Sequence, residues 1–253
     1  MSRQDAGNSE FMIPSAQARG ADDSLQGLGS TTSNSVPITR LPPGGVEAAS
    51  EPHFGYNASK RIVDLGIAVG LLLLTAPVFL VVTLVLLLRG GHVFFGQRRL
   101  GLGAKEFTCW KFRSMVIDAE KQLESVRDMA ANVTQGPTFK NAADPRITGF
   151  GRILRQTSID ELPQLLNVLR GDMSIVGPRP LAVDENRYKP GQDRRLSVKP
   201  GLTCIWQVSG RSDITFDRWM EMDVEYVETR SLRKDLHLIL LTLPAVLTRK
   251  GAM

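Results

Sequence analysis

The sequence predicts a mostly helical α/β protein that a bent apolar helix and amphipathic surface helices attach to a membrane. Three observations support this fold class: an uncharged apolar stretch over Ile67–Leu88, two short strand-like segments that follow it, and amphipathic helical segments in the C-terminal half. The chain has 253 residues, of which 42% are hydrophobic. That length and composition are enough for one folded domain with attachments.

The formal net charge of +5 is unevenly distributed along the chain. Residues 1–60 contain four Lys or Arg and six Asp or Glu, whereas the remainder contains 27 and 20, a net charge of +7. A basic body attracts phosphate-bearing partners, which include anionic lipid, nucleotides and nucleic acid. Nucleic-acid binding has only this charge balance in its favour, so we expect no nucleic-acid partner. Cys109 and Cys204 stand far apart and predict small buried side chains in a reducing compartment.

The first segment, residues 1–55, is rich in Ser, Gly, Pro and Gln and has no apolar periodicity. This composition predicts a disordered tail. No secretory signal is indicated, because no basic start is followed promptly by an apolar run and a cleavage site.

The apolar stretch Ile67–Leu88 contains 22 residues without a charge. It could cross a bilayer core, which needs about 20 apolar residues. Pro77 removes a helix hydrogen bond near its midpoint, and the basic residues Lys60, Arg61 and Arg89 flank both ends. Because basic flanks prefer the cytoplasm, both ends are expected on that side. We therefore predict a re-entrant helix hairpin over 56–90 that is broken at Pro77, and a kinked single-pass anchor remains the alternative.

The segments after the membrane helix predict a small strand pair. Residues 93–95 and 107–112 have strand character and surround a glycine-rich turn at Gly101–Gly103. No Walker pattern follows those glycines, which favours a turn over a phosphate-binding loop.

Helical segments follow the strand pair. A charged helix is predicted from Asp118 to about Met129, a loop over 132–144, and an amphipathic helix over 147–155 that brings Arg152 and Arg155 close together. Residues 236–247 are apolar but too short to span a bilayer. Their basic flanks favour a helix lying in the membrane interface, and a core helix is an equally supported alternative.

The adjacent carboxylates Asp160 and Glu161 are the candidate reactive groups. We expect Asp160 to be the N-cap of a helix that carries Pro163 in its first turn and ends at Gly171. A capping box from Ser158 to Glu161 would place Pro163 less favourably. The bland alternative is that Asp160 only caps the helix and Glu161 is a solvated first-turn acid.

An ionised aspartate can attack phosphorus directly and needs no base to activate it. The negative phosphate oxygens of a substrate must then be neutralised. Arg155, Arg179 and Arg152 are candidates for this role, and a Mg²⁺ ion bound by Asp160 and Glu161 would share the charge with the phosphate. The loop Gly177–Pro180 supports the assignment, because its two prolines stiffen the backbone on either side of Arg179.

Several motifs in one order resemble the bacterial sugar transferase family, the monotopic polyprenyl-phosphate phosphoglycosyl transferases. The matching motifs are Lys60-Arg61 with Asp64, Lys111-Phe112-Arg113-Ser114-Met115, Asp144-Pro145-Arg146-Ile147-Thr148, Asp160-Glu161-Leu162-Pro163-Gln164, Gly171-Asp172-Met173-Ser174, Gly177-Pro178-Arg179-Pro180, Lys199-Pro200-Gly201 and Trp206-Gln207-Val208-Ser209-Gly210-Arg211. The resemblance covers residues 57–253. The chain looks like a short form of the family, without the four-helix membrane region that larger members carry in front.

The resemblance implies a two-step exchange. Asp160 would be the nucleophile on the β-phosphate of a UDP-sugar, UMP would leave, and undecaprenyl phosphate would take the sugar phosphate from the enzyme. Glu161 would assist with Mg²⁺ or with proton handling. Arg155, Arg179 and Arg211 match positions assigned to phosphate or nucleotide contacts, and Lys111 would line the same site. Trp206, if considered alone, is better explained as a core residue.

The resemblance also implies a place in the cell. The family's membrane helix breaks at a Ser-Pro pair, and Ala76-Pro77 stands there in this chain, so the break would rest on Pro77 with Thr75 as a substitute donor. We expect three regions: a tail (1–55), the membrane hairpin (56–90) and a cytosolic catalytic domain (91–253) on the bacterial inner membrane. The enzyme would start a surface polysaccharide from UDP-glucose or UDP-galactose. A non-catalytic scaffold on anionic lipid is the rival function, and the sequence leaves the sugar and the oligomeric state open.

Overall fold

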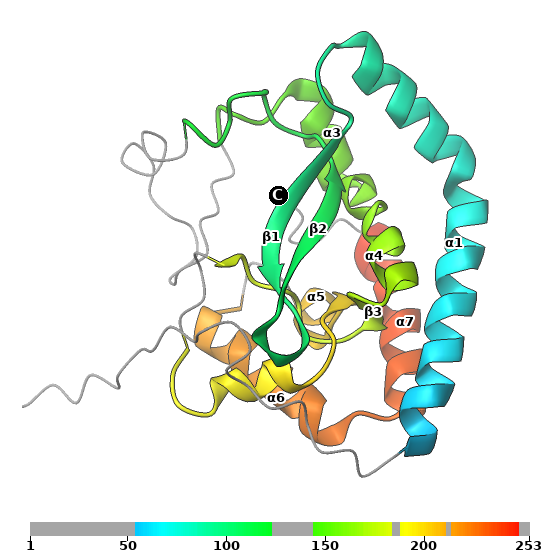
Figure 1. Cartoon of the computed structure of the whole chain (residues 1–253), viewed down its shortest axis with the longest axis vertical. Helices are drawn as coiled ribbons and strands as arrows, with labels where there is room; N and C mark the ends of the chain where they lie inside the picture. The colour runs from blue at the N-terminus through cyan, green and yellow to red at the C-terminus, as the bar shows by residue number, and fades with distance from the viewer. Residues whose placement is uncertain (1–53, 123–143, 184–187, 211–213, 248–253) are drawn as a thin grey trace, which may run out of the picture. The chain divides into compact units, whose positions relative to one another are not determined.

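The computed structural model describes residues 54–122, 144–183, 188–210 and 214–247 (Figure 1). Within these ranges the chain is mostly helical, with two separate two-stranded sheets. Four earlier predictions fall wholly or largely outside the described residues: the tail except Phe54 and Gly55, most of the helix that begins at Asp118, nearly all of the loop 132–144, and the site candidate Arg211.

The N-terminal helix α1 (Phe54–Leu88) is 35 residues long and contains Pro77. It is the one helix in the described ranges that is long and apolar enough to cross a membrane. At a rise of 1.5 Å per residue it is about 50 Å long, which exceeds the roughly 30 Å of a bilayer core. The helix bows around the rest of the described chain, with its concave side inward (Figure 1).

The helix α1 continues through Pro77 without interruption, so the predicted break into a hairpin at this residue is wrong, whereas the return of α1 to one side of a membrane stays a prediction. The Thr75 hydroxyl donates to the Leu71 carbonyl at 2.6 Å. Pro77 has no backbone N–H to donate to the Leu73 carbonyl, and the Thr75 hydroxyl does not replace that donor.

The strand pair was predicted correctly. β1 (Phe94–Leu100) and β2 (Glu106–Phe112) form an antiparallel hairpin in which Phe94 faces Phe112. A 3₁₀ turn, η1 (Leu102–Ala104), joins them, and Gly103 adopts a φ of 65°. The glycine-rich segment is therefore a turn, as predicted. Glycine suits position 103 because it adopts a left-handed conformation without steric cost.

The next helices carry the carboxylate pair. α3 (Gly149–Gln156) matches the predicted amphipathic helix, and the Thr148 side chain caps it by accepting from the Gly151 amide. A 3₁₀ turn, η2 (Ile159–Glu161), follows, and then α4 (Gln164–Arg170).

The predicted position of Asp160 as a helix N-cap is wrong. Pro163 occupies the N-cap position of α4, and Asp160 lies inside η2. The reason is local: Ser158 adopts a left-handed conformation with φ 57°, and a separate 3₁₀ turn that contains Asp160 begins directly after it. The predicted end at Gly171 is confirmed, since this glycine caps α4 with φ 92°.

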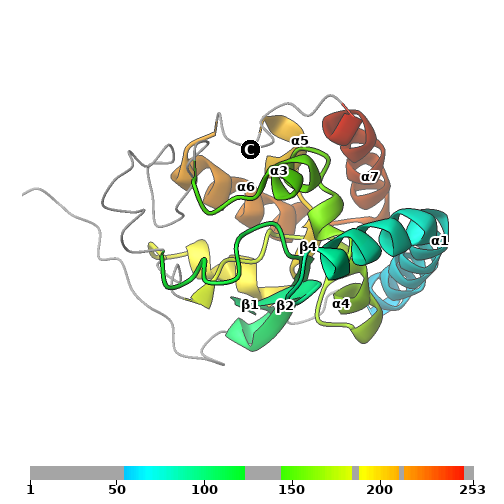
Figure 2. The same ribbon diagram turned by 90° about the horizontal axis from the view of Figure 1, so that it is seen from above.

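The C-terminal half forms the rest of the core. β3 (Ser174–Val176) pairs in parallel with β4 (Gly201–Thr203). The remaining elements are the 3₁₀ segment η4 (Gln192–Ser197) and the helices α5 (Ile205–Ser209), α6 (Phe216–Thr229) and α7 (Leu232–Leu247). Viewed from above, α4 and α7 lie on either side of α1 (Figure 2). All three helices contact β3.

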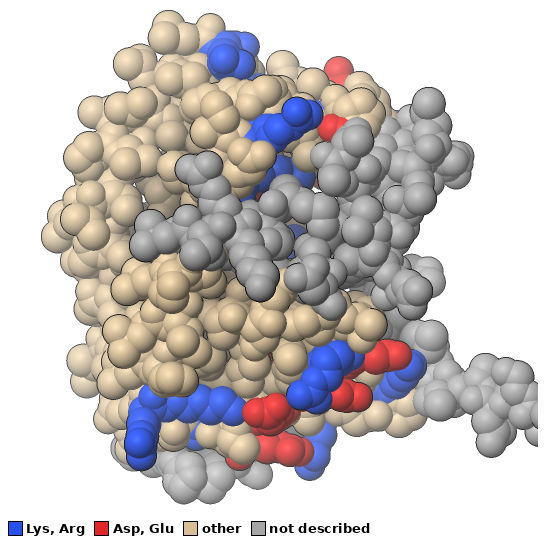
Figure 3. All heavy atoms as spheres, turned by 180° about the vertical axis from the view of Figure 1, so that it is seen from behind, with Lys and Arg blue, Asp and Glu red and all other residues tan. Residues whose placement is uncertain are grey.

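Both halves of α1 pack on the same body. Before Pro77, Ala68 is fully buried in a cluster with Leu165 and Val168 of α4. After Pro77, Val82 and Leu86 are buried with Phe112 and Leu154. The outward face of the helix is apolar, and the edge that α1 forms in Figure 3 shows almost no charged spheres, whereas Lys, Arg, Asp and Glu gather in a band at the lower end.

A buried polar network, the anchoring cluster, joins the first turns of α1 to β3, α6 and α7. Its members are Tyr56, Lys60, Asp64, Ser174, Tyr226 and Asp235. The Asp235 carboxylate accepts from the hydroxyls of Tyr56 at 2.9 Å and Tyr226 at 2.7 Å, and it lies 3.0 Å from Lys60 Nζ. Asp64 accepts from the Ser174 hydroxyl at 2.7 Å and from the Ile175 amide at 3.2 Å.

Helix α7 presents two different faces. Leu238 and Asp235 are buried, whereas Leu236, Leu240 and Leu243 are exposed. The inner face is thus part of the core, which agrees with the core-helix alternative from the sequence. The exposed leucines are compatible with the other alternative, and the interfacial position of α7 stays a prediction.

Candidate active site

The structure places Asp160 and Glu161 in the short turn η2 between α3 and α4. The left-handed Ser158 directly precedes this turn, and such a conformation in a residue other than glycine is uncommon outside functional or strained sites. Asp160 is buried, with a relative exposure of 6%. The turn therefore holds a carboxylate inside the protein rather than at its surface.

Glu161 is held by two cations. Its Oε1 accepts from Lys111 Nζ at 2.8 Å and from Arg179 Nη2 at 2.6 Å, and its Oε2 lies 3.4 Å from Arg179 Nη1. Burial opposes ionisation, but the charges of Arg179 and Lys111 outweigh it and hold the pKa of Glu161 well below its usual range. Glu161 is thus a fixed anion.

Asp160 has a different environment. Burial raises the pKa of Asp160 to about 6, because the charge of Lys111 offsets the loss of water only in part and the charge of Glu161 adds to the rise. The nearest cation among the described residues is Lys111, whose Nζ lies 3.9 Å from Asp160 Oδ2. At neutral pH the carboxylate is ionised and weakly paired, which is the state that a nucleophile needs.

Lys111 comes from β2, and a buried asparagine of α4 fixes that strand. Asn167 is fully buried. Its Oδ1 accepts from the Trp110 amide at 3.0 Å, and its Nδ2 donates to the Thr108 carbonyl at 2.7 Å. This side chain pairs with β2 as a neighbouring strand would. It therefore fixes the position from which Lys111 reaches Glu161.

Arg155 lies near the end of α3, and Ser114 anchors it. Arg155 Nε donates to Ser114 Oγ at 2.9 Å. Burial lowers the pKa of Arg155, and the negative charge of Asp160 is the strongest opposing influence. Arg155 and Asp160 therefore lie close enough for their charges to interact, and the phosphate-binding role of Arg155 stays a prediction. Arg152 points outward from the same helix and is exposed.

Arg179 reaches Glu161 from the Gly177–Pro180 loop. Its guanidinium also lies over the ring of Trp206, with Cζ 5.8 Å from the ring centroid. Trp206 is buried and stacks on Trp219, with ring centroids 4.5 Å apart and an interplanar angle of 19°. The prediction of a core tryptophan is confirmed, and the same ring supports a site arginine.

The site residues predicted from the sequence therefore lie together, apart from Arg211. Asp160, Glu161, Lys111 and Arg179 are in direct contact or close to it, and Arg155 lies beside them. The position of Arg211 is not among those described. No sequence pattern indicated Asn167, and Ser114 had no predicted role although it belongs to the Lys111–Met115 motif. Cys109 and Cys204 are buried free thiols, as predicted.

The residues of this site fit a Mg²⁺ ion only if a phosphorylated substrate supplies some of its ligands. Within the described ranges, no third His, Cys, Asp or Glu joins the two carboxylates to make a metal-binding group. The oxygens of Glu161 already accept from Lys111 and Arg179, whereas the Asp160 carboxylate has capacity for another ligand. Because Mg²⁺ is often bound by one or two carboxylates together with phosphate oxygens, the residues fit an ion shared with a phosphorylated substrate. The pair of ligands Asp160 and Glu161 stays a prediction.

Comparison with known proteins places the chain in a family. The family model described as bacterial sugar transferase matches residues 55–249. The undecaprenyl-phosphate galactose phosphotransferase of Salmonella typhimurium is 41% identical over 196 residues, which is 76% of this chain and 41% of that protein. The exopolysaccharide production protein ExoY of Sinorhizobium fredii is 42% identical over 198 residues, covering 77% of this chain and 88% of that protein.

A third relative has a different sugar in its name. The UDP-glucose:undecaprenyl-phosphate glucose-1-phosphate transferase of Caulobacter vibrioides is 38% identical over 228 residues, or 86% of this chain and 79% of that protein. The chain spans less than half of the Salmonella protein but most of the other two. With a family match that covers most of its length, the chain belongs to the bacterial sugar transferase family.

Proposed function

We propose that this protein transfers a hexose 1-phosphate from a UDP-sugar to undecaprenyl phosphate through a covalent intermediate on Asp160. The observation that carries the proposal is the contrast within the carboxylate pair. Asp160 is buried and weakly paired, and its pKa is raised to about 6, whereas Glu161 is held in ion pairs by Lys111 and Arg179. The relatives named for sugar-phosphate transfer to undecaprenyl phosphate support the substrate class.

In the first step, a carboxylate oxygen of Asp160 attacks the β-phosphorus of the UDP-sugar. A new oxygen–phosphorus bond forms, and the bond from that phosphorus to the bridging oxygen breaks. UMP departs with the bonding electron pair, and the sugar phosphate remains on Asp160 as an acyl phosphate. No proton has to be removed from the nucleophile, because a carboxyl with a pKa of about 6 is ionised at neutral pH.

In the second step, a phosphate oxygen of undecaprenyl phosphate attacks the phosphorus of the aspartyl phosphosugar. The bond to Asp160 breaks, the carboxylate is regenerated, and the product is a sugar–diphosphate–lipid. Water could attack the same intermediate, but a buried site open to lipid rather than to solvent would suppress this hydrolysis.

The cations at the site stabilise the charge that builds up on the phosphates. Lys111, Arg155 and Arg179 lie around the carboxylate pair, and fixed cations near a reacting phosphoryl group lower the barrier to transfer. Glu161 keeps Lys111 and Arg179 in place. A bound Mg²⁺ would supply further neutralisation of the phosphate oxygens, with Asp160 as its ligand from the protein.

We further propose that α1 enters the membrane and returns on one side, at the cytoplasmic face of the bacterial inner membrane. Residues before and after Pro77 pack on one folded body, and the anchoring cluster binds the first turns of α1 to that body. A helix that crossed the bilayer would carry one of these halves away from its partners. Cysteines introduced at Ser2 and Phe95 provide the test: labelling from the same side supports the proposal, and labelling from opposite sides refutes it.

The reaction is tested by measuring UMP. The full chain in nanodiscs is mixed with Mg²⁺, undecaprenyl phosphate and, in separate reactions, UDP-glucose, UDP-galactose and their N-acetyl derivatives. We expect release of UMP with a hexose donor and loss of release in Asp160→Asn. Asp217→Asn is the matched control, because Asp217 is an exposed carboxylate paired with Lys189 at the surface. Unchanged release from Asp160→Asn would refute the nucleophile.

A further inference from the structure

We propose that Arg195 is a positioning residue for this reaction. Its buried guanidinium is held by Asp223, fixes the backbone of Arg179 and thereby sets where the Arg179 side chain meets Glu161. The inference rests on the proposed function, because the proposed role of Arg179 is to bind the donor phosphate. Neither Arg195 nor Asp223 touches the carboxylate pair.

Arg195 and Asp223 form a fully enclosed ion pair. Each side chain has a relative exposure of 1%. Arg195 Nε and Nη2 both donate to Asp223 Oδ2, at 3.0 and 2.7 Å. Desolvating two charges costs several kcal/mol per ion, and replacing such pairs with packed apolar residues is often neutral or stabilising. Stability alone is therefore a weak explanation for this pair.

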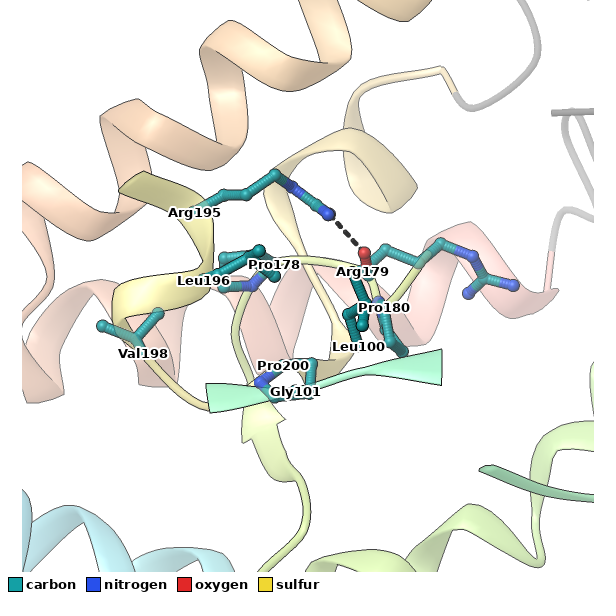
Figure 4. Close-up of a pocket in the computed structure, with 9 residues that line it drawn as sticks. All are labelled: Leu100, Gly101, Pro178, Arg179, Pro180, Arg195, Leu196, Val198 and Pro200. Atoms are coloured by element: carbon teal, nitrogen blue, oxygen red, sulfur yellow. Dashed lines mark hydrogen bonds between the residues drawn. The ribbon is translucent and has the colours of Figure 1, made fainter. Parts of the chain in front are cut away.

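The second contact of Arg195 suggests its purpose. Nη2 also donates to the backbone carbonyl of Arg179. Figure 4 shows the guanidinium of Arg195 approaching that oxygen from one side, while the Arg179 side chain extends away on the other. One nitrogen of Arg195 thus joins the carboxylate of Asp223 on α6 to the backbone that carries the phosphate-binding candidate.

The loop depends on such outside contacts. Pro178 and Pro180 have no backbone N–H, so at these positions the loop has no amide with which to bind its surroundings. Its carbonyls are held instead: that of Pro178 accepts from the Gly201 amide at 2.9 Å, that of Arg179 from Arg195, and that of Pro180 from Arg99. Three consecutive carbonyls are each bound by a different element.

Helix α6 supports both ends of the Arg179 side chain. Asp223 lies one helical turn beyond Trp219, which stacks on Trp206, and the Trp206 ring lies under the Arg179 guanidinium. The same face of α6 therefore fixes the backbone of Arg179 through Arg195 and its guanidinium through the two tryptophans. A small displacement here would move the guanidinium relative to Glu161, and misplacement by about 1 Å can cost roughly 10²-fold in rate.

The test removes the pair while keeping the core filled. In the double variant Arg195→Met, Asp223→Leu no buried charge is left unpaired, so we expect a melting temperature close to that of the native chain. We expect kcat for UMP release to fall roughly 10²-fold. Arg194→Met is the matched control, since the neighbouring Arg194 is exposed and pairs with Glu228 at the surface. A folded double variant with native kcat would overturn the proposal.

A second variant guards against misfolding of the first. Arg195→Lys keeps a positive charge beside Asp223, but one ammonium cannot reproduce the planar fork that binds Asp223 and the Arg179 carbonyl together. We expect a folded protein with a kcat between those of the native chain and the double variant. Native kcat in Arg195→Lys would show that a buried charge suffices, and this result would also overturn the proposal.

Two further readouts separate positioning from general damage. In an Arg179→Ala background, the double variant should lose no more than about threefold, because Arg195 acts through Arg179. Hydrogen exchange of the segment 171–183 should be faster in the double variant and unchanged in Arg194→Met, whether or not UMP is released. A native chain that releases no UMP defeats the proposed function. Two results would defeat the role of Arg195 alone: unchanged hydrogen exchange of 171–183 in the double variant, or a further 10²-fold loss of kcat when the double variant is made in the Arg179→Ala background.

Discussion

The chain contains two buried clusters of carboxylates and cations that differ in how fully their members are paired. In the anchoring cluster, Asp64 accepts from Ser174 and Ile175, and Asp235 accepts from two tyrosine hydroxyls while also pairing with Lys60. In the candidate active site, Asp160 has one cation at 3.9 Å as its nearest partner among the described residues.

The difference teaches how the fold distinguishes a fully paired structural acid from the acid that we propose as the nucleophile. Well-paired carboxylates stabilise the attachment of α1 and have little capacity for further contacts. The weakly paired Asp160 has capacity for another contact, which the proposed attack on phosphorus requires, while its neighbour Glu161 holds Lys111 and Arg179. Burial alone does not make the distinction, since Asp64, Asp160 and Asp235 are all buried.

The largest expected effect is that of Asp160→Asn on activity without a matching loss of stability. We expect UMP release to fall on the order of 10⁴-fold or more, as when a nucleophile is removed. The folded state raises the pKa of Asp160 to about 6, so keeping this group ionised destabilises the fold at any pH above that value. The melting temperature at neutral pH should therefore stay constant or rise. A clear decrease would mean that Asp160 is a structural acid.

The second effect concerns Arg179 and its fork-shaped contact. In Arg179→Lys the contact to Glu161 loses its second nitrogen, and we expect kcat/KM to fall by about 10²-fold. Arg170→Lys, at an exposed position on α4, should behave like the native chain. Equal activity of both variants would remove Arg179 from the phosphate-binding role.

The anchoring cluster should respond in the opposite way. Asp64→Asn weakens contacts to Lys60 and to β3, and we expect a loss of about 1–3 kcal/mol in the free energy of unfolding. Turnover per folded molecule should remain near the native value. Thermal unfolding combined with an active-site titration separates the two quantities, and a large drop in turnover at unchanged stability would erase the contrast between the clusters.

The smallest effect is a shift in pH dependence. Because the proposed nucleophile Asp160 has to be ionised to attack phosphorus, kcat/KM should fall as the pH decreases through about 6. The charge of Lys111 lowers the pKa of Asp160, so Lys111→Met should move this acidic limb to higher pH. A shift to lower pH, or none, would show that Lys111 does not set the charge state of Asp160. Glu161→Gln should move the limb in the opposite direction, since it removes a negative neighbour.

Local patterns in the sequence were sufficient for the elements but not for the site. The uncharged run at Ile67–Leu88 predicted the long apolar helix, and the strand-like segments around Gly101–Gly103 predicted the β-hairpin. The turn at Asp160 was missed because a left-handed serine has no signature in composition or spacing. Its consequence is large, since Asp160 is removed from the helix start where Pro163 appeared to place it.

Long-range contacts were beyond the reach of sequence patterns. Asn167 binds two residues of β2 that are 57 and 59 positions away in the sequence. Arg195 binds Asp223, which is 28 positions away. Neither interaction leaves a periodic trace, because each depends on how distant elements pack. Arg155 and Arg179 were candidates because they stand close to Asp160 in the sequence, whereas the position of Lys111 at the site could be expected only from the family resemblance.

The most direct test of the account is a single-turnover reaction without lipid acceptor. The native chain is mixed with UDP-glucose or UDP-galactose carrying a labelled β-phosphate, and UMP is measured in the first seconds. A covalent intermediate on Asp160 predicts a burst of about one UMP per active site, with the label recovered on the peptide that contains Asp160. Release of UMP only after undecaprenyl phosphate is added, with no label on the protein, would contradict the account.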